Sequence, residues 1–234
     1  MPPDDLPQPL GPTTGVAVLH LFCRVPASAD AGTVLAAEEE ARKEGCQVVA
    51  VALLGHKADL GLVALGPDWW ALRRFQTAVQ RSGLEVDGSY VSLTEVSEYA
   101  AGVPDELKAA RLYPQLPPAG KPAFCFYPMS KRRAVGDNWY SLPFEERRAL
   151  MGGHGKVGRT FAGRVLQVIT GSTGLDDFEW GVTLFATHPD DLKACVYEMR
   201  FDEASARFAE FGPFYTGMVA DLDRVLAGLL GPEG

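Results

Sequence analysis

One order of predicted elements occurs twice along the chain, and it constrains the fold more than any other feature. In each half, short β-rich runs and helical segments follow each other as strand, helix, strand, strand, helix, strand. Two such units predict an α+β protein of two ferredoxin-like βαββαβ halves, whose antiparallel sheets pack or join into a dimeric α/β-barrel protomer.

The apolar periodicity and the capping signals give the expected bounds of these elements. For the first half they predict strands at 16–23, 48–54, 60–65 and 90–96, and helices at 30–44 and 68–80. For the second half they predict strands at 123–127, 165–170, 180–185 and near 205–215, and helices at 142–154, 187–199 and 218–230. We expect Pro128 to break the strand before it. The predicted domains are 12–101, a proline-rich linker at 102–121, and 122–234.

Composition limits the classes of function. The chain has 234 residues, 47% of them hydrophobic, so it can bury a full core. No segment approaches the roughly 18 uncharged apolar residues of a membrane helix. Residues 1–12 lack a basic region and an apolar run, so we expect no signal peptide and a cytoplasmic protein. The net charge of −8 argues against a nucleic-acid or anionic-membrane partner.

The four cysteines, Cys23, Cys46, Cys125 and Cys195, are far apart, and each lies in an apolar segment. None of them forms a CxxC pair, so the spacing suggests neither a zinc site nor a redox motif. We expect buried free thiols, which suit a reducing compartment.

A cationic cluster stands out against the acidic background in the stretch FCFYPMSKRRAVGDNWY, residues 124–140. Lys131, Arg132 and Arg133 follow the predicted strand and indicate a small anionic partner, or only a solvated loop. Tyr127 is either a core or edge aromatic, or a phenol beside a redox centre that can donate a hydrogen atom. Lys131 lies four residues further on and can hold a carboxylate next to that phenol.

His154 lies among glycines in the segment LMGGHGKVGR, where we expect the helix to end. It is either a helix-end histidine without a ligand, or a metal ligand through one ring nitrogen. It has no second histidine or cysteine at ligand spacing, so a structural zinc site is not expected. A haem needs only one axial histidine and suits this count.

Two further arginines are candidates for binding carboxylates. Arg111 lies in the linker, and Arg200 follows a predicted helix. Each either pairs with a nearby acid or binds a substrate with several carboxylates, because the guanidinium matches carboxylate geometry. Ser205 is a minor hydrogen-bond donor. For His20, His56 and His188 we expect structural roles, and the chain has no catalytic triad order, P-loop or dinucleotide fingerprint in the required context.

Three long motifs carry a resemblance to a known family: CFYPMSKRR with DNWYSLPFEERRALMGGHGKVGR, then GRVLQVITGSTGLDDFEWGVTLF, then YEMRFDEASARFAEFGPFYTG. They closely resemble the chlorite dismutase-like superfamily, and within it the coproheme decarboxylases. The match is dense from about Arg111 to Gly217 and looser in the first half. It implies two ferredoxin-like halves, a homopentamer and a haem in the C-terminal half.

The resemblance also implies roles for single residues. His154 matches the proximal iron ligand, and Tyr127 matches the tyrosine that becomes a radical. Lys131 matches the lysine beside the reacting propionate. The positions implied to bind propionates or lie near the porphyrin are Arg111, Trp139, Arg200 and Ser205.

The position of Gln167 distinguishes chlorite dismutases from coproheme decarboxylases. True chlorite dismutases place an arginine on the distal face of the haem, whereas Gln167 matches decarboxylases of the firmicute type. Actinobacterial decarboxylases use a distal histidine, and this chain has no histidine between His56 and His154. Because glutamine cannot act as a base, peroxide itself or water would take that role.

The implied activity is the peroxide-dependent oxidative decarboxylation of two propionates of Fe-coproporphyrin III (coproheme), giving haem b. Hydrogen peroxide oxidises the iron centre, and Tyr127 then removes a hydrogen atom from a propionate. Transient contact with a coproporphyrin ferrochelatase is a further expectation. The alternatives are a haem-binding or haem-delivery protein, or a chlorite dismutase or haem peroxidase.

Overall fold

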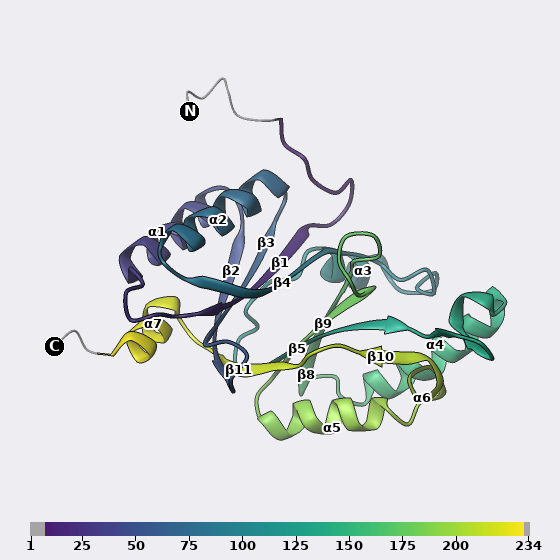
Figure 1. Ribbon diagram of the computed structural model, residues 1–234. Coiled ribbons are helices and arrows are strands. Elements are labelled where there is room, and N and C mark those ends of the chain that lie inside the picture. The colour runs from purple at the N-terminus through teal and green to yellow at the C-terminus, as the bar shows by residue number, and fades with distance from the viewer. Residues whose placement is uncertain (1–7, 232–234) are drawn as a thin grey trace. The chain divides into compact units, whose positions relative to one another are not determined.

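The computed structural model describes residues 8–231, and contacts within the chain divide it into two compact units. The first unit comprises the chain up to Thr94 together with the segment from Ala220 onward. The second unit runs from Glu95 to Val219. Figure 1 shows the order of the elements by colour, from purple at the N-terminus to yellow at the C-terminus.

The first unit is a four-stranded antiparallel sheet in the order β2-β3-β1-β4. This is the strand order of a ferredoxin-like fold, with two helices connecting the strands. Its elements are β1 (Ala17–Arg24), α1 (Ala31–Lys43), β2 (Gln47–Leu54), β3 (Leu60–Gly66), α2 (Trp69–Arg81), β4 (Glu85–Thr94) and, from the end of the chain, α7 (Leu222–Leu230).

Local signals in the sequence set the ends of the helices. The side chain of Asp30 accepts hydrogen bonds from the backbone N–H groups at the start of α1, and Asp68 does the same for α2. Gly45 follows α1 with a φ of +84°, which a glycine adopts without steric cost. The expected bounds of both helices are therefore confirmed to within one residue.

The second unit has the same strand order, β8-β9-β5, with both β10 and β11 on the other edge of β5. The prediction of two ferredoxin-like halves is thus confirmed. Its elements are α3 (Asp105–Leu112), β5 (Ala123–Lys131), β6 (Arg133–Ala134), β7 (Asp137–Asn138), a 3-10 turn (Trp139–Ser141), α4 (Phe144–Arg159), β8 (Val165–Gly171), β9 (Trp180–Ala186), α5 (Pro189–Met199), α6 (Glu203–Phe208), β10 (Ala209–Phe211) and β11 (Tyr215–Val219).

The prediction that Pro128 breaks its strand was wrong. β5 continues to Lys131, and Pro128 pairs with Gly181 of β9. The carbonyl of Pro128 accepts a hydrogen bond from Gly212, in the break between β10 and β11. Because the N–H and C=O of one strand residue point to the same side, the missing N–H of the proline falls at this break.

Two other expectations in the second unit also need correction. α4 does not end at His154 but continues to Arg159, because glycines weaken a helix without stopping it. Residues 203–208 form α6, not the start of a strand, and the side chain of Asp202 caps that helix. The linker at 102–121 stays a prediction, and α3 lies within it.

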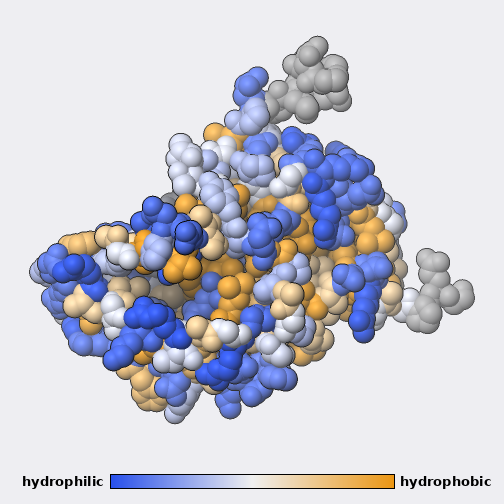
Figure 2. Space-filling view, turned by 180° about the vertical axis from the view of Figure 1, so that it is seen from behind, coloured by the Kyte–Doolittle hydropathy of each residue, from blue (hydrophilic) through white to orange (hydrophobic). Residues whose placement is uncertain are grey.

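The two units have separate hydrophobic cores. In the first, strand residues pack against α1, α2 and the buried face of α7. In the second, the inner residues of β5 and β9 pack against α5. All four cysteines are buried, as the apolar sequence around them predicted. Figure 2 shows one face of the molecule, where hydrophilic residues are interspersed with apolar ones. Across residues 8–231, no helix has the length and apolarity needed to cross a bilayer.

Candidate functional site

One face of the second sheet holds most of the candidate residues. Side chains alternate along a strand, so Cys125, Tyr127 and Lys131 of β5 project from the same face. Cys125 and Tyr127 share a buried cluster with Leu192 and Cys195 of α5, so α5 covers this face. The Nζ of Lys131 donates a hydrogen bond of 3.1 Å to a backbone carbonyl in α6. The sheet, α5 and α6 therefore enclose the site.

His154 projects from α4 towards α6, where two side chains hold its Nδ1. Asp202 Oδ2 lies 3.0 Å from Nδ1, and Ser205 Oγ lies 3.3 Å from it. A carboxylate accepts only, so Nδ1 carries the proton and Nε2 is the nitrogen left for a ligand. The packing of α4 against α6 thus fixes both the tautomer and the direction of the imidazole.

Asp202 is nearly inaccessible, with 5% of its side chain exposed. Burial opposes its ionisation, but the hydrogen bonds from His154 and Ser205 outweigh that effect and hold the pKa of Asp202 below its usual value. The same carboxylate caps α6 by accepting from the N–H of Ser205 at 3.1 Å. Asp202 therefore stays negatively charged beside the imidazole at neutral pH.

Lys131 is a buried cation, with 6% of its surface exposed. Burial lowers its pKa to about 8, although Asp202 and Glu179 act in the opposite direction. Its Nζ lies over the ring of Trp139, 4.5 Å from the centroid, and Trp139 itself is buried. Glu179 accepts a hydrogen bond of 2.8 Å from the backbone N–H of Lys131, not from its ammonium.

Tyr127 is buried between aromatic rings. Phe214 stacks on it at 4.5 Å between centroids, and Phe211 meets it edge-on at 5.6 Å. Burial raises the pKa of Tyr127 well above its usual range, although the positive charge of Arg200 acts against this. Arg200 lies over the Phe211 ring at 4.9 Å, so the cation and the phenol are linked through one aromatic cluster.

Gln167 lies on β8 and faces the helices. Its Nε2 is 3.7 Å from the sulfur of Cys195, and a Cβ built on Gly158 of α4 would lie 3.6 Å from the same nitrogen. Burial raises the pKa of Cys195 to about 11, so this thiol stays protonated. Gln167 is thus a neutral amide near the glycine-rich part of α4.

Arg111 is not brought to this cluster. It is exposed near the end of α3, and among the described residues no hydrogen bond or ion pair joins it to α4, α5 or α6. Arg132 lies 3.5 Å from Glu210, and Arg133 is exposed in a short hairpin. The structure therefore brings together His154, Lys131, Trp139 and Ser205, with Tyr127 and Arg200 linked through Phe211.

Two residues of this cluster, Asp202 and Phe214, were not predicted from the sequence. Asp202 holds His154 and caps α6. An aspartate just before a helix is a capping signal, because its side chain accepts from a backbone N–H of the first turn, but the expected strand obscured this signal. The aromatic wall formed by Phe214 had no sequence signal, because it depends on the break between β10 and β11.

The architecture and the site define a ferredoxin-like α+β protein with a carboxylate-held histidine and a buried tyrosine in the same unit. The chain belongs to the chlorite dismutase family, whose profile matches residues 26–220. The resemblance noted in the sequence is thereby confirmed at the level of the family.

Known relatives agree with this assignment. A putative heme-binding protein of Natronomonas pharaonis is 48% identical over 192 residues, which are 75% of this chain and 31% of the relative. The chain thus spans about a third of the length of that curated relative. A solved heme-binding protein from Thermus thermophilus is 37% identical, with a TM-score of 0.82 over 97% of this chain and 99% of that one.

A mutant chlorite dismutase from Candidatus Nitrospira defluvii has a TM-score of 0.76 over 94% of this chain and 98% of its own. Its sequence is 21% identical, so this likeness concerns the fold alone.

Proposed function

We propose that the chain binds coproheme and catalyses its hydrogen-peroxide-dependent decarboxylation to haem b. The observation that carries this proposal is that one unit holds both a carboxylate-held histidine and a buried, neutral tyrosine, with Arg200 linked to the tyrosine through Phe211 and Lys131 bonded to α6. The names of the heme-binding relatives support a tetrapyrrole ligand, and the sequence resemblance supports the reaction.

The donor set fits an iron porphyrin. A porphyrin supplies the equatorial nitrogens, so the protein needs only one axial ligand, and Nε2 of His154 is free for that role. A carboxylate on the other ring nitrogen is the usual partner of a ligating histidine, because it orients the ring and raises its basicity. No group of three or more potential metal-ligating side chains occurs within residues 8–231. A site with a single protein ligand is therefore the fitting one.

Lys131 and Arg200 would hold propionates. Lys131 is charged below pH 8, and a carboxylate beside its ammonium would offset the cost of burying it. Arg200 presents its planar guanidinium without a carboxylate partner among the described residues. Ser205 already contacts His154, and Trp139 would line the site. Roles for Arg111 and Gln167 rest on the resemblance alone.

The iron and macrocycle of the substrate would react with hydrogen peroxide and so provide the oxidising power. Tyr127 would give up its phenolic hydrogen atom to the oxidised substrate and then take a hydrogen atom from the propionate β-carbon. The second oxidising equivalent of the peroxide takes up one further electron, and loss of carbon dioxide then leaves a vinyl group. Each cycle consumes one peroxide and releases two waters. The high pKa of Tyr127 supports this role, since the phenol keeps its hydrogen at neutral pH.

The reaction is tested by incubating the protein with coproheme and titrated peroxide, followed by mass analysis of the porphyrin. We expect loss of two carboxyl groups with the wild type. Tyr127→Phe should bind coproheme with an unchanged Soret band but yield no haem b, because phenylalanine has no transferable phenolic hydrogen. Normal product formation by this variant would overturn the role of Tyr127.

A second candidate is a haem-binding or haem-delivery protein, which the names of both relatives favour. In that case the wild type binds coproheme and leaves its carboxyl groups intact under peroxide. Chlorite dismutation is the third possibility, and Gln167 in place of a distal arginine counts against it. Measuring oxygen evolution from chlorite separates it from the other two.

The proposal also covers the oligomeric state of the protein and its location in the cell. The resemblance supports a homopentamer in the cytoplasm that receives coproheme in transient contact with a ferrochelatase. Analytical ultracentrifugation of the purified protein tests the pentamer, since a mass well below five protomers would contradict it.

A further inference from the structure

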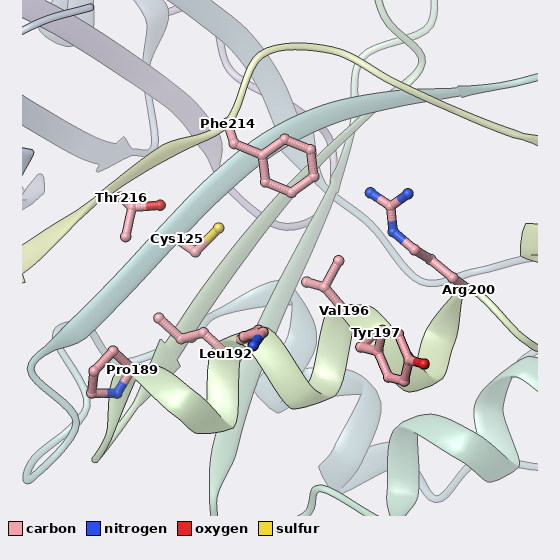
Figure 3. Close-up of a pocket in the computed structure, with 9 residues that line it drawn as sticks. Cys125, Pro189, Leu192, Val196, Tyr197, Arg200, Phe214 and Thr216 are labelled. Carbon is pink, nitrogen blue, oxygen red and sulfur yellow. The ribbon is translucent and has the colours of Figure 1, made fainter. Parts of the chain in front are cut away.

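A cavity lies on the same unit, between α5 and the paired strands β5 and β11 (Figure 3). Its volume is about 330 Å³, which is at the small end of the range for organic-ligand pockets. In Figure 3, Leu192 and Val196 of α5 line one side, and Cys125, Phe214 and Thr216 lie across from them. The cavity is therefore mostly apolar and differs from the environment of His154.

Two cations line this cavity: Lys193 of α5, and Arg200, which directly follows that helix. They are seven positions apart, so a helical rise of about 1.5 Å per residue separates them by roughly 10 Å along the axis. Both are exposed, and among residues 8–231 neither forms an ion pair. In an acidic protein, two unpaired cations along an apolar cavity favour an anionic ligand with an apolar body.

Arg200 is the better anchor of the two. Its guanidinium lies 4.9 Å above the Phe211 ring, which limits its freedom, and its planar fork can bind a carboxylate through two hydrogen bonds. Lys193 is a flexible point charge that raises the potential at the other end of the cavity.

We propose that this cavity binds an amphipathic organic carboxylate. The carboxylate pairs with Arg200, and the apolar chain lies along Val196 and Phe214. The cavity shares Arg200 with the proposed coproheme site, so an occupant competes for that cation, and Cys125 and Phe214 also belong to the cluster around Tyr127. Because Phe214 stacks on Tyr127 at 4.5 Å, an occupant also contacts the wall of the buried tyrosine.

The test uses octanoate as the probe and the full chain without tetrapyrrole, with binding followed by calorimetry and by saturation-transfer NMR. We expect saturable binding to the wild type, weakened at least about tenfold by Arg200→Gln through loss of the charge-assisted hydrogen bonds. Thr216→Phe should block the cavity, since an aromatic residue suits an exposed strand position and fills the mouth. Octanol, which lacks the charge, should bind at least about tenfold more weakly than octanoate.

Arg81→Gln is the matched control, because it removes an exposed cation from the last turn of α2, in the other unit. Its affinity for octanoate should equal that of the wild type. The proposal is overturned if the wild type shows no saturable binding, or if Arg200→Gln and Thr216→Phe both bind octanoate normally. Because coproheme is absent, the result does not depend on the proposed decarboxylation.

Discussion

Lys131 shows how a single buried cation can link ligand binding to stability. Burial lowers its pKa from 10.5 to about 8, so the unfolded chain binds the proton more tightly than the folded protein does. The free energy of unfolding therefore rises with pH between about 8 and 10.5, where only the unfolded state still holds the proton. Below about pH 8 the folded protein bears the full cost of the buried charge.

Lys131→Met should remove that cost. We expect the variant to be more stable than the wild type in the ligand-free form, with a gain that is about 2 kcal/mol larger at pH about 6.5 than at pH about 9.5. Urea unfolding at the two pH values measures the difference. A gain that does not change with pH would show that the charge of Lys131 is not the cause.

Asp202→Asn should weaken tetrapyrrole binding by about 10- to 100-fold and shift the Soret band, because the imidazole of His154 loses its charged partner. The amide still fills the same space and can accept at the cap of α6, so the far-ultraviolet circular dichroism should not change. Asp137→Asn is the control, since that side chain is 44% exposed and lies 3.7 Å from Arg207. Wild-type affinity and spectrum in Asp202→Asn would show that the contact does not tune the histidine.

α4 is a weak helix at the level of its own sequence. Four glycines lie within it, and none of its residues, all of which the structure describes, is fully buried. A glycine in a helix costs about 0.5–1 kcal/mol relative to alanine. The helix therefore depends on contacts such as that between His154 and Asp202 rather than on burial.

Gly153→Ala should raise the free energy of unfolding by about 0.5–1 kcal/mol, because a Cβ there has nothing within 4 Å. Gly174→Ala is the matched comparison: the space is equally open, but a φ of +81° disfavours alanine, so this change should destabilise. Urea denaturation distinguishes the two. A loss of stability in Gly153→Ala would mean that α4 is not continuous past this residue in solution.

The elements that the sequence predicted well are those with strong local signals. Asp30 and Gly45 mark the start and the end of α1, and the sequence reveals them because capping and positive φ are local properties. The prediction at Pro128 was wrong because the effect of a missing N–H depends on what lies beside the strand, which is not a local property. Among the site residues, His154 and Tyr127 could be identified from their residue types. The contact between Asp202 and His154 could not, because it depends on the packing of α4 against α6. Distances between segments remote in sequence are not local properties, so only the structure supplied them.

At the scale of the whole chain, the final helix contributes to the first core. Leu226 of α7 is 1% exposed within the cluster formed by α1 and β2, although these are far apart in sequence. Leu226→Ala should cost about 2–5 kcal/mol, whereas Leu229→Ala, at a residue 37% exposed, should cost much less. Hydrogen exchange should show lost protection in β2 and α1. Loss confined to β5 and β9 would contradict the assignment of α7 to the first unit.

The break between β10 and β11 has a consequence for what the chain can tolerate over time. A side chain at Gly212 would approach Pro128 and Phe178 to within 2.7 Å, so the break has no spare room. It is also the gap through which Phe214 reaches Tyr127. A substitution of Gly212 would thus disturb the packing around the phenol, although this glycine takes no part in the chemistry. The break between β10 and β11 is therefore as constrained as Tyr127 itself.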